Sequence, residues 1–379
     1  FSKDARNPKS YNFTLTDRYI ERIIKEGGSQ VFFRLGQSIE NHGQKKGAYP
    51  PKDFKKWATI CEHIIRHYNE GWADGFHHNI VYWEIWNEPD LDKYDWWTSP
   101  KTWGGTAESF FELYTITTRH LKKCFPNLKI GGPALAGYED WAEEFMKHMS
   151  ANKVPIDFFS WHLYATKPQD IVAKANRMRT LCDKYGYTQT ESILNEWNYI
   201  KNWTKDFAYS IATMSAVKGA AFVAATMSAC QDSSVDKLMY YDARPSAFNG
   251  MWDFYTLRPL KGYYPFKWYG MFYDMKHEIV CENTPDHIYT LCGENGEGKL
   301  LSVITYYSDD NSLEDKTVKV DFGKESEYEI YLLDSEHNAE LVDTTRPSPQ
   351  YVGSTTPSTH TSILSIAGPV RLTVISLRA

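Results

Sequence analysis

Residues 80–89 read IVYWEIWNEP, and the interpretation of the whole chain starts from this stretch. The run from Ile80 to Asn87 is short, apolar and aromatic and ends at a turn signal, which predicts a buried strand. Glu88 follows directly, before a proline, so a carboxylate is expected at the carboxyl end of that strand. Runs of the same kind predict further strands at residues 30–35, 129–132, 158–164, 192–197 and 220–225.

Helical patterns lie between these runs. The clearest covers residues 53–72, where apolar side chains recur every three to four positions. Strands that alternate with helices predict βα units and a parallel sheet. The length of the chain and the number of units favour a closed (β/α)8 TIM barrel, because no glycine-rich phosphate loop of the open-sheet type follows any strand. The other predicted helices cover residues 109–124, 139–149, 168–185 and 207–218.

The pattern changes near Lys276. Beyond it, short runs of alternating apolar and polar residues are separated by Gly, Asn, Asp and Ser, which predicts a small antiparallel β-sandwich packed on the barrel. We therefore expect a catalytic barrel over residues 1–275 and an accessory β domain over residues 276–379. Its predicted strands cover residues 288–292, 300–307, 317–322, 328–333 and 370–377.

The composition argues against several classes of protein. A net charge of -6 gives no attraction to nucleic acid or to an anionic membrane surface. The longest nearly unbroken apolar run, Ala220 to Cys230, is much shorter than the ~18 residues that a membrane span needs. Aromatic residues make up 15% of the chain, which indicates either a well-packed core or a groove whose flat faces stack on sugar rings.

Two glutamates carry the predicted chemistry. Glu88 ends one strand, and Glu196 lies near the end of another, in the segment LNEWN at residues 194–198. Active sites of barrels lie at the carboxyl ends of the strands, so the two carboxylates are expected to face each other across the mouth. A retaining glycoside hydrolase needs such a pair about 5–5.5 Å apart, one carboxyl protonated and one ionised. The alternative is two solvated strand-end charges, which the surrounding Trp and Asn residues disfavour.

Four segments, in this order and spacing, resemble glycoside hydrolase family 39, the clan A family of β-xylosidases and α-L-iduronidases. The resemblance covers residues 1–273 and implies that Glu88 is the general acid/base and Glu196 the nucleophile of a double displacement. It also implies that Asn87 binds the sugar 2-hydroxyl, and that His162 and Tyr164 line the site by touching the sugar or by orienting a glutamate. The segments are YWEIWNEPDL at 82–91, KIGGPA at 129–134, DFFSWHLY at 157–164 and NEWN at 195–198.

The sequence departs from the family pattern in three places. The first barrel strand precedes the part of the pattern where Phe1 begins, so this strand is expected to be missing from the chain. The third strand reads FFRLG at residues 32–36 where the β-xylosidases have a glutamate near a glycine. The predicted eighth strand continues as ATMSA at residues 225–229 instead of a Tyr-Trp-Thr pattern. These changes leave the reaction type intact and the identity of the sugar open.

Arg34 and two loops supply further candidate contacts. Arg34 ends the strand at residues 31–35 and is interpreted as a ligand of the substrate, as the cation that keeps the nucleophile ionised, or as half of a structural ion pair. Trp97 lies in the loop that begins at Glu88 and is a candidate for stacking on a sugar. The loop after the last predicted barrel strand contains the candidate substrate contacts Asp242, Arg244 and Trp252, and Arg244 could recognise a uronic acid. The alternative is a buried loop that is only anchored by its aromatic residues.

No metal ion or organic cofactor is predicted, because two carboxylates and water complete the reaction. His63 and His67 have the spacing of helix ligands, but Cys61 falls on the opposite, apolar face of that helix. A metal site is therefore not expected there.

The sequence thus predicts a retaining glycoside hydrolase that acts on oligosaccharides derived from plant or host polysaccharides. One rival is a carbohydrate-binding relative that has lost turnover, and another is a clan A hydrolase of a different family that cuts within a chain. A substrate of this class favours export to the periplasm or the cell exterior. Nucleic acid is not an expected partner, and the oligomeric state stays open.

Overall fold

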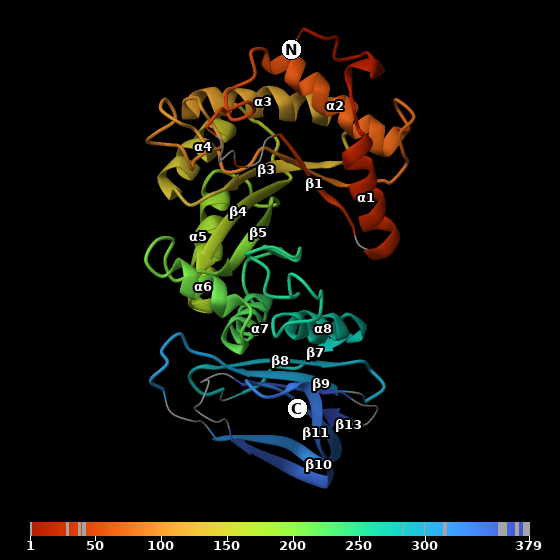
Figure 1. Ribbon diagram of the computed structural model, residues 1–379, viewed down its shortest axis with the longest axis vertical. Helices are drawn as coiled ribbons and strands as arrows, with labels where there is room; N and C mark the ends of the chain where they lie inside the picture. The colour runs from red at the N-terminus through yellow and green to blue at the C-terminus, as the bar shows by residue number, and fades with distance from the viewer. Residues whose placement is uncertain are drawn as a thin grey trace. The chain divides into compact units, whose positions relative to one another are not determined.

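The computed structural model describes residues 2–27, 30–36, 39, 43–282, 284–298, 300–313, 317–354, 362–367 and 371–373. Helices alternate with strands through most of the chain, and strands dominate the last part (Figure 1). The alternating elements are η1 (Pro8–Ser10), α1 (Thr14–Gly27), β1 (Phe32–Leu35), α2 (Phe54–Glu70), β2 (Tyr82–Ile85), α3 (Ala107–Cys124), β3 (Lys129–Leu135), α4 (Glu139–Ala151), β4 (Phe158–Ala165), α5 (Pro168–Lys184), β5 (Glu191–Tyr199), α6 (Phe207–Met214), α7 (Val217–Gln231), β6 (Lys237–Tyr240), α8 (Tyr263–Met271) and η2 (Phe272–Asp274). The last strands are β7 (His277–Glu278), β8 (Ile288–Glu294), β9 (Leu300–Tyr306), β10 (Thr317–Leu333), β11 (Asn338–Ser354), β12 (Ser362–Ala367) and β13 (Arg371–Thr373).

Six strands form one sheet in the order β1-β2-β3-β4-β5-β6. The pairs β1–β2, β2–β3 and β3–β4 are parallel, and in the first of them Arg34 lies opposite Glu84. A helix follows each of the strands β1 to β5. This succession of βα units confirms the predicted α/β class and the TIM-barrel-like architecture.

Local sequence explains where the helices begin and end. At the start of α2, the Asp53 side chain accepts the backbone N–H of Lys56 at 2.9 Å and so satisfies one of the free donors of the first turn. At its end, Gly71 adopts a φ of +74°, which residues with a Cβ rarely do. Between these two residues, Trp57, Cys61 and other apolar side chains are buried. The predicted helix over residues 53–72 therefore corresponds to α2.

The strand predicted at residues 220–225 is wrong, because this run lies inside α7. Five of the seven residues from Gly219 to Ala225 are alanine or glycine. Twelve of the fifteen residues of α7 are buried, so the helix is apolar on all sides. An apolar run does not distinguish a buried strand from a buried helix, and alanine has the highest helix propensity. The sixth strand of the sheet is β6, at residues that the sequence analysis assigned to a loop.

The chain forms two compact units. The first consists of Phe1–His162 with Arg177–Asn195, and the second of Leu163–Asn176 with Glu196–Ala379. In the first unit, α2 packs beside α3, and α3 packs on α4 and β3. In the second unit, α7 packs on β8 and β9. The domain boundary predicted near residue 276 stays a prediction.

The last strands form a seven-stranded sheet in the order β11-β10-β13-β12-β9-β8-β7. Neighbours are antiparallel except β10 and β13, and all seven residues of β9 are buried. The runs predicted at residues 317–322 and 328–333 belong to one long strand, β10, and residues 370 and 374–377 of the last predicted strand lie outside the described residues. Among the described helices, none alone is long and apolar enough to cross a membrane; α6 and α7 pass that test only as a pair bent by 77°.

Asp309 anchors the loop after β9 within the second unit. Its Oδ1 accepts the Tyr199 hydroxyl at 2.6 Å and lies 3.0 Å from the Lys218 ammonium group, and both partners are buried. Asp309→Ala leaves these two donors without their shared acceptor, so we expect the free energy of unfolding to fall by about 2–3 kcal/mol in urea denaturation. The matched control is Glu336→Ala, whose side chain is exposed and should change stability by less than about 0.5 kcal/mol. Equal losses in the two variants would contradict the anchoring role.

Candidate active site

The chain turns sharply between the end of β2 and Glu88. Trp86 and Glu88 have φ values of +73° and +49°, which residues other than glycine rarely adopt. Neighbouring strands impose this conformation, because Trp86 N–H donates to the Leu35 carbonyl at 2.8 Å and Glu88 N–H donates to the Ala134 carbonyl at 3.0 Å. Such strain costs about 1–3 kcal/mol per residue and persists where the surroundings fix it, often at functional sites.

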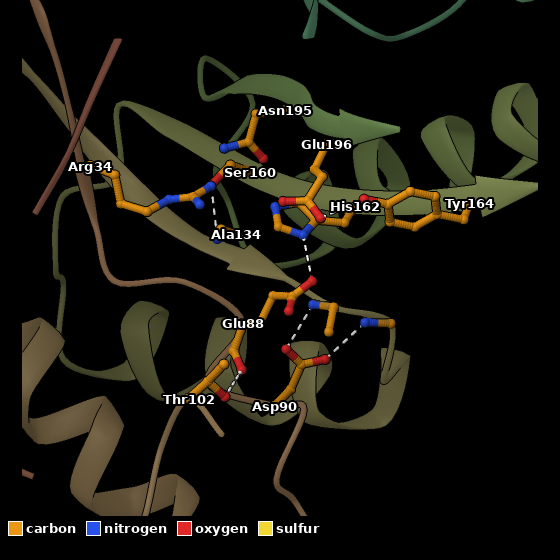
Figure 2. A network of polar contacts seen from close by, with 12 residues as sticks. Arg34, Glu88, Asp90, Thr102, Ala134, Ser160, His162, Tyr164, Asn195 and Glu196 are labelled. Carbon is orange, nitrogen blue, oxygen red and sulfur yellow. Dashed lines mark hydrogen bonds and ion pairs between the residues drawn. The ribbon is translucent and has the colours of Figure 1, made fainter. Parts of the chain in front are cut away.

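The Glu88 side chain is buried and paired. Its Oε1 lies 2.7 Å from Nδ1 of His162, a buried residue of β4 (Figure 2). The backbone carbonyl oxygen of Glu88 accepts the Thr102 hydroxyl at 2.6 Å. An imidazole nitrogen donates or accepts a hydrogen bond according to its tautomer. His162 can therefore serve Glu88 in either protonation state of the carboxyl group.

Two buried aspartates hold the loop that follows Glu88. Asp90 accepts the backbone N–H groups of residues 136–138 at 2.8–3.0 Å. Asp92 accepts those of residues 101–103 at 2.7–2.9 Å through one oxygen, Oδ2. Each carboxylate thus satisfies three backbone donors of a loop, which fixes residues 101–103 and 136–138 against the segment that follows Glu88.

Glu84 is a fully buried carboxylate that the sequence analysis did not identify as functional. Its Oε2 accepts Nε of Arg34 at 2.5 Å, and its Oε1 accepts the Ser160 hydroxyl and Nδ2 of Asn195, each at 2.6 Å. Arg34 therefore forms the structural ion pair that was one of its three predicted roles. A charge in the middle of an apolar strand was the only signal in the sequence, since buried charges must be paired.

Glu196 has a different donor. In the second unit, the Tyr164 hydroxyl donates to Glu196 Oε1 at 2.6 Å. The Tyr164 ring lies 4.8 Å from that of Trp203 and 6.3 Å from that of Phe248. Burial, and then the negative charge of Glu196, raise the pKa of Tyr241. Three aromatic residues that were not predicted as site residues therefore lie close to the Tyr164–Glu196 pair.

The loop after β6 makes contacts mainly within itself. Asp242 is buried and accepts the backbone N–H of Arg244 at 3.0 Å and its guanidinium group at 2.9 Å. Ser246 donates to the same carboxylate at 3.1 Å. Trp252 packs against the ring of Tyr263 at 4.9 Å. Asp242 and Arg244 thus pair with each other, and only the Trp252 contact is of the aromatic kind that the alternative to substrate binding predicted.

Asn87 and Trp97 present contrasting surfaces. Asn87 is buried beside Glu88, and among the described residues its Oδ1 has no hydrogen-bond partner. A buried amide oxygen without a partner is costly, so a ligand or water that binds there is expected. Trp97 is 64% exposed and contacts the ring of Trp96 edge-on at 5.6 Å.

The potential metal ligands on α2 are engaged with protein groups. His63 Nδ1 lies 2.8 Å from the Thr59 carbonyl, and His67 Nε2 lies 3.0 Å from the Asp17 carboxylate. Glu62 of α2 and His120 of α3 lie near Cys124, but His120 Nε2 lies 2.7 Å from Glu62 Oε2, so these two residues pair with each other. Protein contacts therefore account for these side chains.

Comparisons with known proteins identify relatives of the chain. Residues 1–244 match the family described as "Glycosyl hydrolases family 39". A beta-xylosidase from Geobacillus stearothermophilus is 30% identical over 175 residues, which are 43% of this chain and 32% of that protein. A beta-xylosidase from Caldicellulosiruptor saccharolyticus is 33% identical over 186 residues, 44% of this chain and 36% of that protein. The matched segment thus spans about a third of each of these relatives.

The fold resembles that of solved structures along almost the whole chain. A glucosidase from Croceicoccus marinus gives a TM-score of 0.77 at 24% identity and covers 97% of this chain and 84% of its own. At this level of identity the likeness concerns the fold, and it supports the TIM-barrel-like architecture.

Asp90 is expected to make stability depend on pH. Burial raises the pKa of its carboxyl group more than the three N–H donors lower it, so the folded state binds this proton more tightly than the unfolded state. The resulting stabilisation is complete below the unfolded pKa of about 3.9 and is lost as pH rises through the folded value. Relative to Asp90→Asn, which does not titrate, the wild type should therefore lose stability in urea denaturation as pH rises above about 4.

Asp140 provides the control of opposite sign. Its hydrogen bond with Lys93 lowers the pKa of its carboxyl group, so its contribution to stability is present above the unfolded pKa of about 3.9 and is lost as pH falls below it. Relative to Asp140→Asn, the wild type should therefore lose stability as pH falls below about 4, by a small amount because Asp140 is exposed. A wild type that gains stability relative to Asp90→Asn as pH rises would contradict the account.

Proposed function

Because the chain belongs to glycoside hydrolase family 39, we propose that it hydrolyses O-glycosidic bonds in oligosaccharides derived from plant or host polysaccharides. The observation that carries this proposal is the pair of glutamates Glu88, three residues after β2, and Glu196, within β5, each with a hydrogen-bonding partner suited to a distinct role. Two relatives are named beta-xylosidases, so a xyloside is the first substrate to test.

The proposed reaction is a retaining double displacement. The Glu196 carboxylate attacks the anomeric carbon while the Glu88 carboxyl group protonates the leaving oxygen, which gives a glycosyl-enzyme ester. Glu88, now ionised, then takes a proton from a water molecule that attacks the same carbon and releases Glu196. Each step leaves Glu88 in the protonation state that the next step requires.

The partners of the two glutamates support this assignment of roles. The Tyr164 hydroxyl donates a hydrogen bond to Glu196 Oε1 and so orients the carboxylate that acts as the nucleophile. Glu88 must instead alternate between protonated and ionised forms. The His162 nitrogen beside it can accept or donate, so its hydrogen bond can persist through the cycle.

Sugar binding is assigned to polar and aromatic groups around these carboxylates. Asn87, adjacent in the chain to Glu88, is the proposed ligand of the sugar 2-hydroxyl, an interaction that strengthens in the transition state. Trp203 is 54% exposed and contacts Tyr164, so it is a stronger candidate for stacking on a sugar ring than Trp97. Arg244 remains the proposed reader of a carboxylate if the substrate is a uronide.

We also propose that the sheet closes as an eight-stranded barrel and that β7–β13 form an accessory sandwich. β1 is the end strand in the order of the described sheet. A cavity of about 360 Å³ lined mainly by apolar residues of α1 and β1 lies beside it. A further strand next to β1 would bury these groups, as the (β/α)8 architecture requires.

Kinetics of Glu88→Gln and Glu196→Gln test the proposal. The wild type is assayed on aryl xylosides, arabinosides, glucosides, galactosides and uronides, and the variants on the best substrate. Glu196→Gln should lose at least about 10³-fold in kcat with every leaving group, because no glycosyl-enzyme can form. Glu88→Gln should lose about 10²–10⁴-fold with a poor leaving group and less with an activated dinitrophenyl group, which needs no proton. Azide should restore turnover only in Glu88→Gln.

Glu191→Gln is the matched control, since this glutamate lies at the amino end of β5 and pairs with Lys129 and Tyr82. It should retain most of the wild-type kcat. Activity that survives in Glu196→Gln would contradict the assignment of the nucleophile. A wild type that binds oligosaccharides but hydrolyses no member of the panel would favour the carbohydrate-binding alternative.

A further inference from the structure

A chain of hydrogen bonds connects Glu84 to the backbone of Glu88. The Ser160 hydroxyl donates to Glu84 Oε1 at 2.6 Å. The same hydroxyl oxygen accepts the Ala134 N–H at 2.9 Å (Figure 2). The Ala134 carbonyl in turn accepts the Glu88 N–H at 3.0 Å. The buried carboxylate of Glu84 thus reaches the strained turn that carries Glu88 through only two intervening residues.

A second connection leads from Glu84 to the residue before Glu196. Asn195 donates its Nδ2 to Glu84 Oε1 at 2.6 Å and is joined to Glu196 by a peptide bond. The hydrogen bond that holds the Asn195 side chain therefore restrains the strand backbone from which Glu196 projects. Arg34 balances the charge of Glu84 through Oε2 and leaves Oε1 for both of these connections.

We propose that Glu84 is a positioning residue that fixes the placement of both predicted catalytic glutamates, Glu88 through Ser160 and Ala134, and Glu196 through Asn195. Its kinetic consequences rest on the proposed function. Hydrogen bonds to an ionised group are short and strong, and low polarity around a buried network strengthens them. A displacement of about 1 Å between reacting groups costs roughly 10²-fold in rate, so the placement of each glutamate on its own strand end is the property that such a network protects.

The alternative is that Glu84 only neutralises Arg34. Buried ion pairs often contribute little net stability compared with apolar packing, but removal of one partner is strongly destabilising. Stability measurements alone therefore cannot separate a positioning role from simple charge compensation. The two roles differ in their effect on kcat for the folded enzyme and on the mobility of the two strand ends.

The test compares Glu84→Gln and Ser160→Ala with Glu191→Gln. Glu84→Gln is isosteric, Ser160→Ala breaks only the connection to Ala134, and Glu191→Gln removes a carboxylate from an ion pair at the other end of β5. Two properties are measured on folded protein: kcat and KM on the best substrate, per active site titrated with a mechanism-based inactivator, and amide hydrogen exchange by mass spectrometry.

Glu84→Gln should lower kcat roughly 100-fold and change KM less than about threefold, because the placement of reacting groups, not ground-state binding, is disturbed. Exchange should rise in peptides containing residues 86–90, 132–136 and 194–198. Ser160→Ala should raise exchange only in the first two. The double variant Asn195→Ala/Glu84→Gln should lower kcat by a smaller factor than the product of the two single-variant factors, because both substitutions disturb the hydrogen bond from Asn195 Nδ2 to Glu84 Oε1.

A fall in kcat no larger than in Glu191→Gln, or unchanged exchange at residues 86–90 and 194–198, would overturn the proposal. If the wild type hydrolyses no glycoside, the proposed function fails, and the exchange data alone then decide whether Glu84 fixes the two strand ends. The two failures are therefore distinguishable.

Discussion

A carboxylate removed from water needs donors on all sides, and Glu84 finds them on three other strands of the sheet. Arg34 supplies the charge, while Ser160 and Asn195 supply the remaining hydrogen bonds. Because these partners come from β1, β4 and β5, the requirement of one buried charge ties four strands together at Glu84. Glu88 follows β2 four residues after this carboxylate.

The positive φ values of Trp86 and Glu88 follow from the same constraint. A turn of this kind relaxes unless neighbouring strands hold it, and here the carbonyl groups of Leu35 and Ala134 accept its N–H groups. Asp90 and Asp92 then bind the loops on either side through six backbone donors. The side chain of Glu88 is thus carried on a rigid support, although it lies in a loop.

The sequence was informative where function depends on local pattern. An acid close to the end of an apolar run marks Glu88 and Glu196 as candidates, because strand ends and active sites coincide in barrels. It was uninformative where the deciding contacts join residues distant in the chain: the partners of Glu84 lie 50 to 111 positions away, and nothing local marks them. The α7 error has another cause, since an apolar, alanine-rich run fits a buried strand and a buried helix equally well by periodicity.

The central claim, that Glu196 forms a covalent intermediate, is tested most directly by trapping that intermediate. The wild type is incubated with a 2-deoxy-2-fluoro glycoside of the sugar that it hydrolyses, digested, and mapped by mass spectrometry. The account predicts a single glycosyl adduct on Glu196 that forms at the rate of inactivation. An adduct on another residue, or turnover that yields the inverted anomer with no adduct, would contradict it.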